Sequence, residues 1–240
     1  MGFGKQQVLV ALATAVLSAC GGGGGDAGSG PPPPAAGPTT IDAAAAWRNF
    51  ITTNQNWIVG GVGNDNKGYV INITLTPGTA QVFPLNGTTY ATTTAAVATR
   101  IGGIDIPTTS NISYFNPTTY VLAGTRNTDA NAAPTCSETT ASVVPPTSAA
   151  IGSSGALQTF NDRNGCLSTS TSEGTSTTTW SVESEAGITF FCLNTTTRNL
   201  AGAVEATESD CVQSAADGTL GPKARVSLSQ AGGFTLVARN

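Results

Sequence analysis

The feature that most constrains this chain is an alternation of apolar and polar residues that begins near Trp57 and continues to the C-terminus. Tyr69, Ile71, Ile73 and Leu75 are all apolar, whereas the residues between them are mostly polar. A period of two places successive side chains on opposite faces of an extended strand. The sequence therefore predicts half-buried β-strands, which the abundance of β-branched threonine also favours.

Turn signals separate these strands at short intervals. We expect turns at residues 63–68, at Pro77 and Gly78, at Asn86 and Gly87, and near residues 198–202. Residues 127–155 hold three prolines and many small polar residues, and we expect a long loop there. The further expected strands are 80–85, 88–101, 104–106, 112–115, 120–125, 156–161, 166–172, 175–183, 188–195, 203–212, 224–230 and 234–239.

These strands and turns predict an all-β fold, an antiparallel meander that forms a barrel or a sandwich. A membrane-spanning barrel is disfavoured, because its strands need about 9–11 residues with an apolar outer face. The strands expected here are mostly shorter and rich in threonine. One short helix is expected before them, with Thr40 as cap and Asp42 in its first turn. Its Trp47, Phe50 and Ile51 should dock on the body.

The N-terminal residues divide into an export signal and a tether. Lys5 precedes the apolar run 8–16, which is too short to span a bilayer and ends at small residues. Residues 20–38 are rich in glycine and proline, as flexible linkers are. We therefore predict a signal peptide at 1–19, a tether at 20–38 and a single β domain at 39–240.

The end of the signal, Leu17-Ser18-Ala19-Cys20, resembles the lipobox of bacterial lipoproteins. The resemblance implies cleavage before Cys20 and acylation of that residue with chains such as palmitate, which would anchor the protein in a membrane. Gly21 follows, where an aspartate often retains family members at the inner membrane. We therefore expect an outer-membrane lipoprotein, with its periplasmic or cell-surface orientation left open.

Four cysteines follow the tether. Export places Cys136, Cys166, Cys192 and Cys211 in an oxidising compartment, and their even number predicts two disulfides. Three pairings exist, and we favour Cys136–Cys166 and Cys192–Cys211. A hairpin turning near Leu200 would place the second pair nearly opposite each other. Metal binding by these thiols is disfavoured, because there is no C-x-x-C pair and no histidine.

Catalytic chemistry has little support in the sequence. The absence of histidine excludes Ser-His-Asp and Cys-His catalysis. Lys67 and Lys223 stand beside turn residues and are interpreted as solvated. Glu183 and Glu185 should share one strand face, where solubility is a simpler role than glycoside cleavage. We therefore predict no enzyme activity, no cofactor and no resident metal.

Two acidic segments could attract Ca²⁺ but lack the ligand order of a dedicated loop. The first is the cluster of Glu205, Glu208 and Asp210 beside a cysteine, and the second is the turn 64–66. We interpret both as ordinary surface features. The formal net charge is −4 with no basic patch, so nucleic acid is a poor partner.

The tail segments 206–212, 217–229 and 232–240 resemble those of uncharacterised Thr/Ser-rich proteobacterial lipoproteins. We expect a lipid-anchored, non-catalytic envelope protein that serves as a structural or interaction module, with an envelope protein as its partner. The alternative is a carrier that holds a small apolar ligand or lipid in a barrel cavity. Aromatic residues that could line such a cavity are Trp57, Tyr69, Phe83, Tyr90, Trp180 and Phe190.

Overall fold

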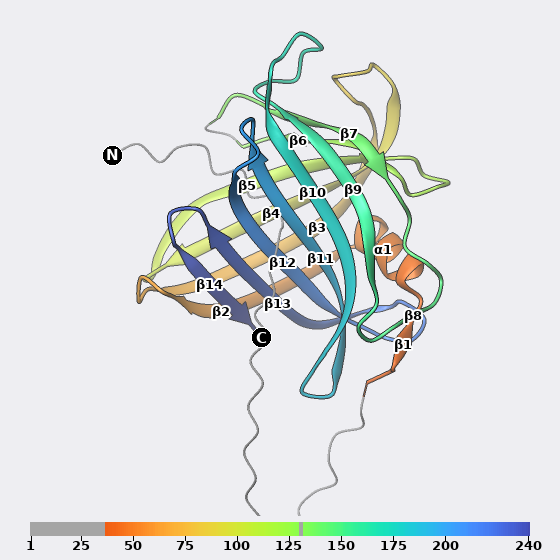
Figure 1. Ribbon diagram of the computed structural model, residues 1–240, viewed down its shortest axis with the longest axis vertical. Coiled ribbons are helices and arrows are strands. Elements are labelled where there is room, and N and C mark those ends of the chain that lie inside the picture. Colours follow the sequence, from red (N-terminus) through yellow and green to blue (C-terminus); the bar gives the residue numbers. More distant parts are fainter. Residues whose placement is uncertain (1–36, 130–131) are drawn as a thin grey trace, which may run out of the picture.

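The computed structural model describes residues 37–129 and 132–240, which form a closed antiparallel barrel of twelve strands with one short helix (Figure 1). The predicted all-β fold is confirmed, and the sheet is a barrel rather than a sandwich. The predicted signal peptide, Cys20 and all of the tether except residues 37 and 38 lie outside the described residues.

The barrel is an up-and-down meander in which neighbours in the chain are neighbours in the sheet. A separate two-stranded pairing joins β1 (Thr40–Ile41) to β8 (Ala149–Ala150). The barrel strands are β2 (Gln55–Gly63), β3 (Gly68–Val82), β4 (Thr89–Ile101), β5 (Ile104–Phe115), β6 (Leu122–Asn127), β7 (Cys136–Ser142), β9 (Ser154–Arg163), β10 (Ser172–Glu185), β11 (Ile188–Asn199), β12 (Val204–Ser214), β13 (Leu220–Gln230) and β14 (Thr235–Arg239).

Several expected strand ends are wrong, and most of the strands are longer than predicted. β3 runs through Pro77 and Gly78, where the pairing with β4 shifts register beyond Gly78 instead of turning. Residues 166–171 form a turn rather than a strand, and Gly174 lies within β10. The expected loop at 127–155 contains β7 and β8. Long-range pairing overrides local turn propensity at Pro77, Gly78, Gly174 and in β7 and β8, whereas residues 166–171 find no strand partner.

The barrel closes where β14 pairs with β2, between Leu236↔Gly63 and Arg239↔Gly60. A side chain on Gly61 would have its Cβ 2.1 Å from the carbonyl oxygen of Val237. Only glycine therefore allows the first and last barrel strands to approach this closely. Gly60 differs, because the nearest atom to a Cβ there would be 3.7 Å away.

Side-chain alternation divides each strand between the barrel interior and its outer surface. The predicted apolar face of β3 points inward, with Ile71 and Leu75 buried beside Trp57 and Val59 of β2. The intervening Val70, Asn72, Thr74 and Thr76 point outward, and outward positions on other strands are likewise rich in threonine and serine.

The helix α1 (Ala43–Thr52) has its N-cap at Asp42, whose Oδ1 accepts a hydrogen bond from Ala45 N at 2.8 Å. The expected cap Thr40 lies instead in β1. Trp47 Nε1 donates to the Tyr120 carbonyl at 3.0 Å, and Asn49 donates to the Gly218 carbonyl at 2.9 Å. Loops at one end of the barrel therefore hold the helix in place.

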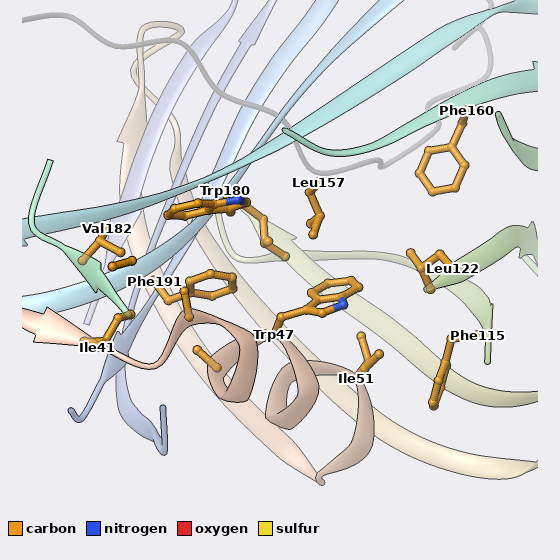
Figure 2. Packing of buried hydrophobic residues seen from close by; sticks show 14 residues of the cluster. Ile41, Trp47, Ile51, Phe115, Leu122, Leu157, Phe160, Trp180, Val182 and Phe191 are labelled. Carbon is orange, nitrogen blue, oxygen red and sulfur yellow. The ribbon is translucent and has the colours of Figure 1, made fainter. Parts of the chain in front are cut away.

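The inward face of α1 packs into the barrel, as predicted for Trp47 and Ile51 (Figure 2). These two side chains meet Phe115, Trp180 and Phe191 from the barrel wall, and all five are buried. Thr93 Oγ1 of the wall also donates a hydrogen bond to the Ile51 carbonyl. The helix thus supplies core to one end of the interior, which we call the α1 end. Among the described residues, no helix has the length and apolarity needed to cross a membrane.

The close approach at the seam generates a test of barrel closure. The substitution Gly61→Ala should destabilise the fold by about 1–3 kcal/mol, because the new methyl group meets backbone that must shift. Gly60→Ala, its neighbour on the same strand, should change stability by less than about 1 kcal/mol. Urea unfolding of both variants measures the difference, and equal effects would contradict the seam.

Candidate functional site in the barrel interior

The inner wall is apolar near α1. Toward the other end of the barrel, which we call the far end, it becomes polar on β6, β7 and β9 to β12, whereas β3 and β14 keep apolar residues such as Ile71 and Leu236. The far end is the one closed by the turns 64–67, 102–103, 164–171, 200–203 and 231–234. Buried polar residues at inward positions of this half are Thr125, Ser137, Asp162, Ser176, Thr178, Thr195 and Glu208. Asp210 is also buried and inward, but it shares a cavity with Phe50 of α1. This combination of hydroxyls and carboxylates makes the interior the candidate site.

Asp162 of β9 lies at the centre of a hydrogen-bonded row across four strands. Its two carboxyl oxygens accept hydrogen bonds from Ser137 Oγ and Ser176 Oγ, both at 2.6 Å. Ser176 Oγ also lies 3.3 Å from Thr197 Oγ1. Burial raises the pKa of Asp162, although the two serine hydrogen bonds act in the opposite direction. Asp162 is thus a satisfied, structural carboxylate.

Asp210 of β12 lies in a different environment. It is only 8% exposed, and its Oδ1 has no hydrogen-bond partner. It lines a cavity of ≈ 20 Å³ together with apolar residues of α1, β2, β3, β12 and β13 and with Cys211 and Arg225 of the wall. We call this the Asp210 cavity, and its other side-chain neighbours on the inner face are Phe50, Trp57, Ile73, Val212, Ala224 and Val226. Burial raises the pKa of Asp210 to about 7.

Basic residues of the barrel lie on the opposite side of the wall. Arg225, for example, follows the inward Ala224, and its guanidinium donates to the carboxylates of Glu183 and Glu185 on the outer surface. Strand pairing and alternation assign outward positions to every Arg and Lys on the described strands, namely Arg100, Arg126, Arg163, Arg198, Lys223, Arg225 and Arg239. The buried charged groups on the inner wall of the described barrel are the carboxylates of Asp162, Glu208 and Asp210.

Glu183 and Glu185 share the outer face of β10, as predicted. Arg225 pairs with Glu183 at 2.5 Å and with Glu185 at 2.8 Å, and Arg239 also pairs with Glu185. Such half-buried ion pairs occupy the carboxylate oxygens on one surface rather than across a cleft. The arrangement supports a structural role for these two residues.

Both predicted disulfides are confirmed, Cys136–Cys166 and Cys192–Cys211. Cys192 and Cys211 lie directly opposite each other on β11 and β12, as the expected hairpin requires. Each bond belongs to an apolar cluster on the outside of the barrel, the first with Phe83 and Tyr114 and the second with Phe190. In the Phe83 cluster, Gly124 leaves room for the ring, because a Cβ there would lie 2.3 Å from Phe83 Cζ.

The other sequence candidates are separated by the fold. The predicted acidic cluster splits, because Glu208 and Asp210 point inward whereas Glu205 is exposed. Asp65 accepts hydrogen bonds from Lys67 N and Tyr69 Oη, which stabilise an ordinary turn. Among the described residues, the one group of side chains close enough to share a metal ion is Glu183, Cys192 and Cys211, and both cysteines are disulfide-bonded.

Sequence reasoning grouped Asp210 with surface acids and did not select Asp162. Strand alternation could have identified both as inward residues, since Asp210 shares a face with Val212 and Asp162 shares one with Phe160. The six aromatic residues proposed for a carrier cavity also divide by face. Trp57, Tyr69 and Trp180 belong to inward positions, and Phe83, Tyr90 and Phe190 to the outer clusters.

In comparisons with known proteins, no family profile, no curated protein and no solved structure matches this chain.

The raised pKa of Asp210 predicts a pH-dependent stability. Between about pH 4 and the folded value of about 7, the unfolded chain has released a proton that the folded protein retains. Stability should therefore fall as pH rises across this interval, by about 1 kcal/mol per pH unit from this group, and level off above it.

The substitution Asp210→Asn should remove that part of the slope, as measured by urea unfolding at several pH values between about 5 and about 8. Glu205→Gln is the matched control, because it removes an exposed carboxylate from the same strand. An unchanged slope in Asp210→Asn would show that Asp210 is already ionised in the folded protein at low pH.

Proposed function

We propose that this chain is a lipid-anchored, non-catalytic protein of the bacterial outer membrane that presents its barrel as an interaction module. The observation that carries the proposal is the direction in which the barrel would point from its tether. The chain enters the body at the α1 end, and large apolar side chains are exposed on the turns of the far end.

The point of entry is defined by contacts of the first described residues. Gly37 N donates to the Gly187 carbonyl at 2.6 Å, and Thr189 Oγ1 donates to the Pro38 carbonyl at 2.5 Å. Both partners lie at the β10–β11 turn, at the α1 end. A tether from an acylated Cys20 would therefore attach to the α1 end, so the far end would point away from the membrane.

The far end offers contact residues. Ile104, Leu167 and Leu200 are 70%, 71% and 72% exposed, and each belongs to a different far-end hairpin. Isolated exposed apolar residues are common on soluble proteins. Their recurrence on three hairpin ends at the same end of a barrel supports a surface that binds a partner.

The residue types on the outer wall favour a domain that lies in water beside the membrane over one that spans it. The expectation that the strands are too short to span a membrane is wrong, because β3 has 15 residues and β10 has 14. Outward positions nevertheless carry hydroxyls such as Thr177 and Thr179 and ion pairs such as Arg163 with Glu138. A lipid-facing band requires apolar residues at those positions.

The second candidate is a carrier of a small apolar ligand or lipid, which the closed barrel favours. Against it, the apolar half of the interior is packed around α1, and the Asp210 cavity has room for about one water molecule. A lipid would therefore need α1 to move. Solvent extraction of the purified protein separates the candidates, because a carrier brings stoichiometric lipid with it.

The proposal is tested in cells by replacing Cys20 with serine. The wild-type protein should fractionate with the outer membrane and carry acyl chains, and Cys20→Ser should lose both, because the thiol is the acylation site. In the same cells, a photo-cross-linker at Leu200 should give discrete protein adducts. The matched control is the same cross-linker at Val143, an exposed apolar residue of the α1 end.

Membrane attachment that survives Cys20→Ser would refute the anchor. Equal adducts from Leu200 and Val143, or none from either, would refute the far end as the contact surface.

A further inference from the structure

We propose that the Asp210 cavity binds the primary ammonium group of a small organic amine. This site is distinct from the far-end surface proposed above, and its existence depends on neither the lipid anchor nor a protein partner.

The Asp210 carboxylate lacks a donor that a buried carboxylate needs. Asp210 is more than nine-tenths buried, lines the cavity and has an Oδ1 without a hydrogen-bond partner. An unpaired buried acceptor costs about 1–3 kcal/mol, and more when it is charged. Asp162 shows how this fold satisfies a buried carboxylate, with one serine on each oxygen. No such donor is provided at Asp210 Oδ1, so a donor from outside the chain would complete the site.

The charged groups on the inner wall around the cavity are negative. A cation in the cavity would face Asp210, with Glu208 two residues away on the same inward face. The cavity neighbours from α1, β2, β3 and β13 that point inward are Phe50, Trp57, Ile73, Ala224 and Val226, none of which is charged. Arg225 also lines the cavity, but its guanidinium donates to Glu183 and Glu185 on the outer surface. The environment is therefore complementary to a cation and unfavourable to an anion.

The side chains that line the cavity favour an ammonium group over a metal ion. Ca²⁺ needs six to eight oxygen ligands, whereas the inward-pointing lining supplies one carboxylate among apolar side chains. Phe50 and Trp57 contribute aromatic rings that stack at 6.2 Å between centroids. The indole of Trp57 is oriented by its hydrogen bond to the Gly221 carbonyl at 3.0 Å. Aromatic surface next to a carboxylate is a favourable environment for an ammonium group.

The volume of the cavity limits the group that can enter it. A cavity of ≈ 20 Å³ has room for a group about as large as one water molecule. A primary ammonium group fits that limit, whereas a trimethylated one exceeds it. Methylammonium is the organic amine that comes closest to this limit, and its single methyl group would lie against the apolar inner wall, to which Ile73 and Val226 belong.

The amine must meet an ionised carboxylate, so binding should depend on pH. Burial raises the pKa of Asp210 to about 7, whereas an alkylammonium stays protonated to about pH 10. Affinity should therefore increase from about pH 5.5 to about pH 8 as Asp210 loses its proton. A bound ammonium in turn should lower the pKa of Asp210.

The experiment titrates the full-length protein with methylamine by calorimetry at about pH 8, where we expect a Kd of about 10 mM. The probes methanol and tetramethylammonium test charge and size, and neither should bind. Asp210→Asn should weaken methylamine binding at least about tenfold. Asp162→Asn, which also removes a buried inward carboxylate, should change it less than about threefold.

A second measurement does not require a variant to fold. The carboxyl ¹³C resonance of Asp210 in the wild-type protein should titrate near pH 7, and methylamine should move its midpoint to lower pH. The proposal is overturned if methylamine does not bind, if methanol binds equally well, or if the midpoint does not move. Equal binding by wild type and Asp210→Asn would likewise place the amine elsewhere.

Discussion

Closure of the sheet between its first and last barrel strands is the constraint on which the rest of this structure depends. Each strand pairs with its neighbour in the chain, so the seam between β14 and β2 is where distant parts of the barrel meet. That seam requires Gly61, because backbone of Val237 occupies the space of a side chain. Once the seam is closed, alternation assigns every strand residue to an interior or to an outer surface, and no open barrel edge remains.

A closed barrel must fill its interior, and this chain does so in two different ways. At one end, α1 brings Trp47 and Ile51 against Trp180 and Phe191, which forms an apolar core. Toward the other end, hydroxyls satisfy Asp162 from two sides. Asp210, which lines a cavity with Phe50 of α1, keeps one oxygen without a donor.

The sequence predicted what depends on near neighbours. The hairpin that pairs Cys192 with Cys211, the inward face of β3 and the docking of Trp47 all follow from local periodicity and turn residues. It failed where distant strands decide the outcome. Pro77 and Gly78 were predicted as a turn, because the adjacent sequence does not reveal their pairing with β4. Asp210 was predicted to be a surface residue, because its apolar neighbours come from α1, β2, β3 and β13, which are distant in the sequence.

Native-state hydrogen exchange tests most directly whether α1 belongs to the barrel core. The amides of Asn49, Phe50 and Ile51 should exchange as slowly as those of β11, because the helix can open only when its buried face leaves the barrel. The amides of the exposed far-end turns should exchange much faster. If the α1 amides exchanged as fast as those turns, the helix would be a loosely attached segment, and the account of a barrel filled by α1 would be contradicted.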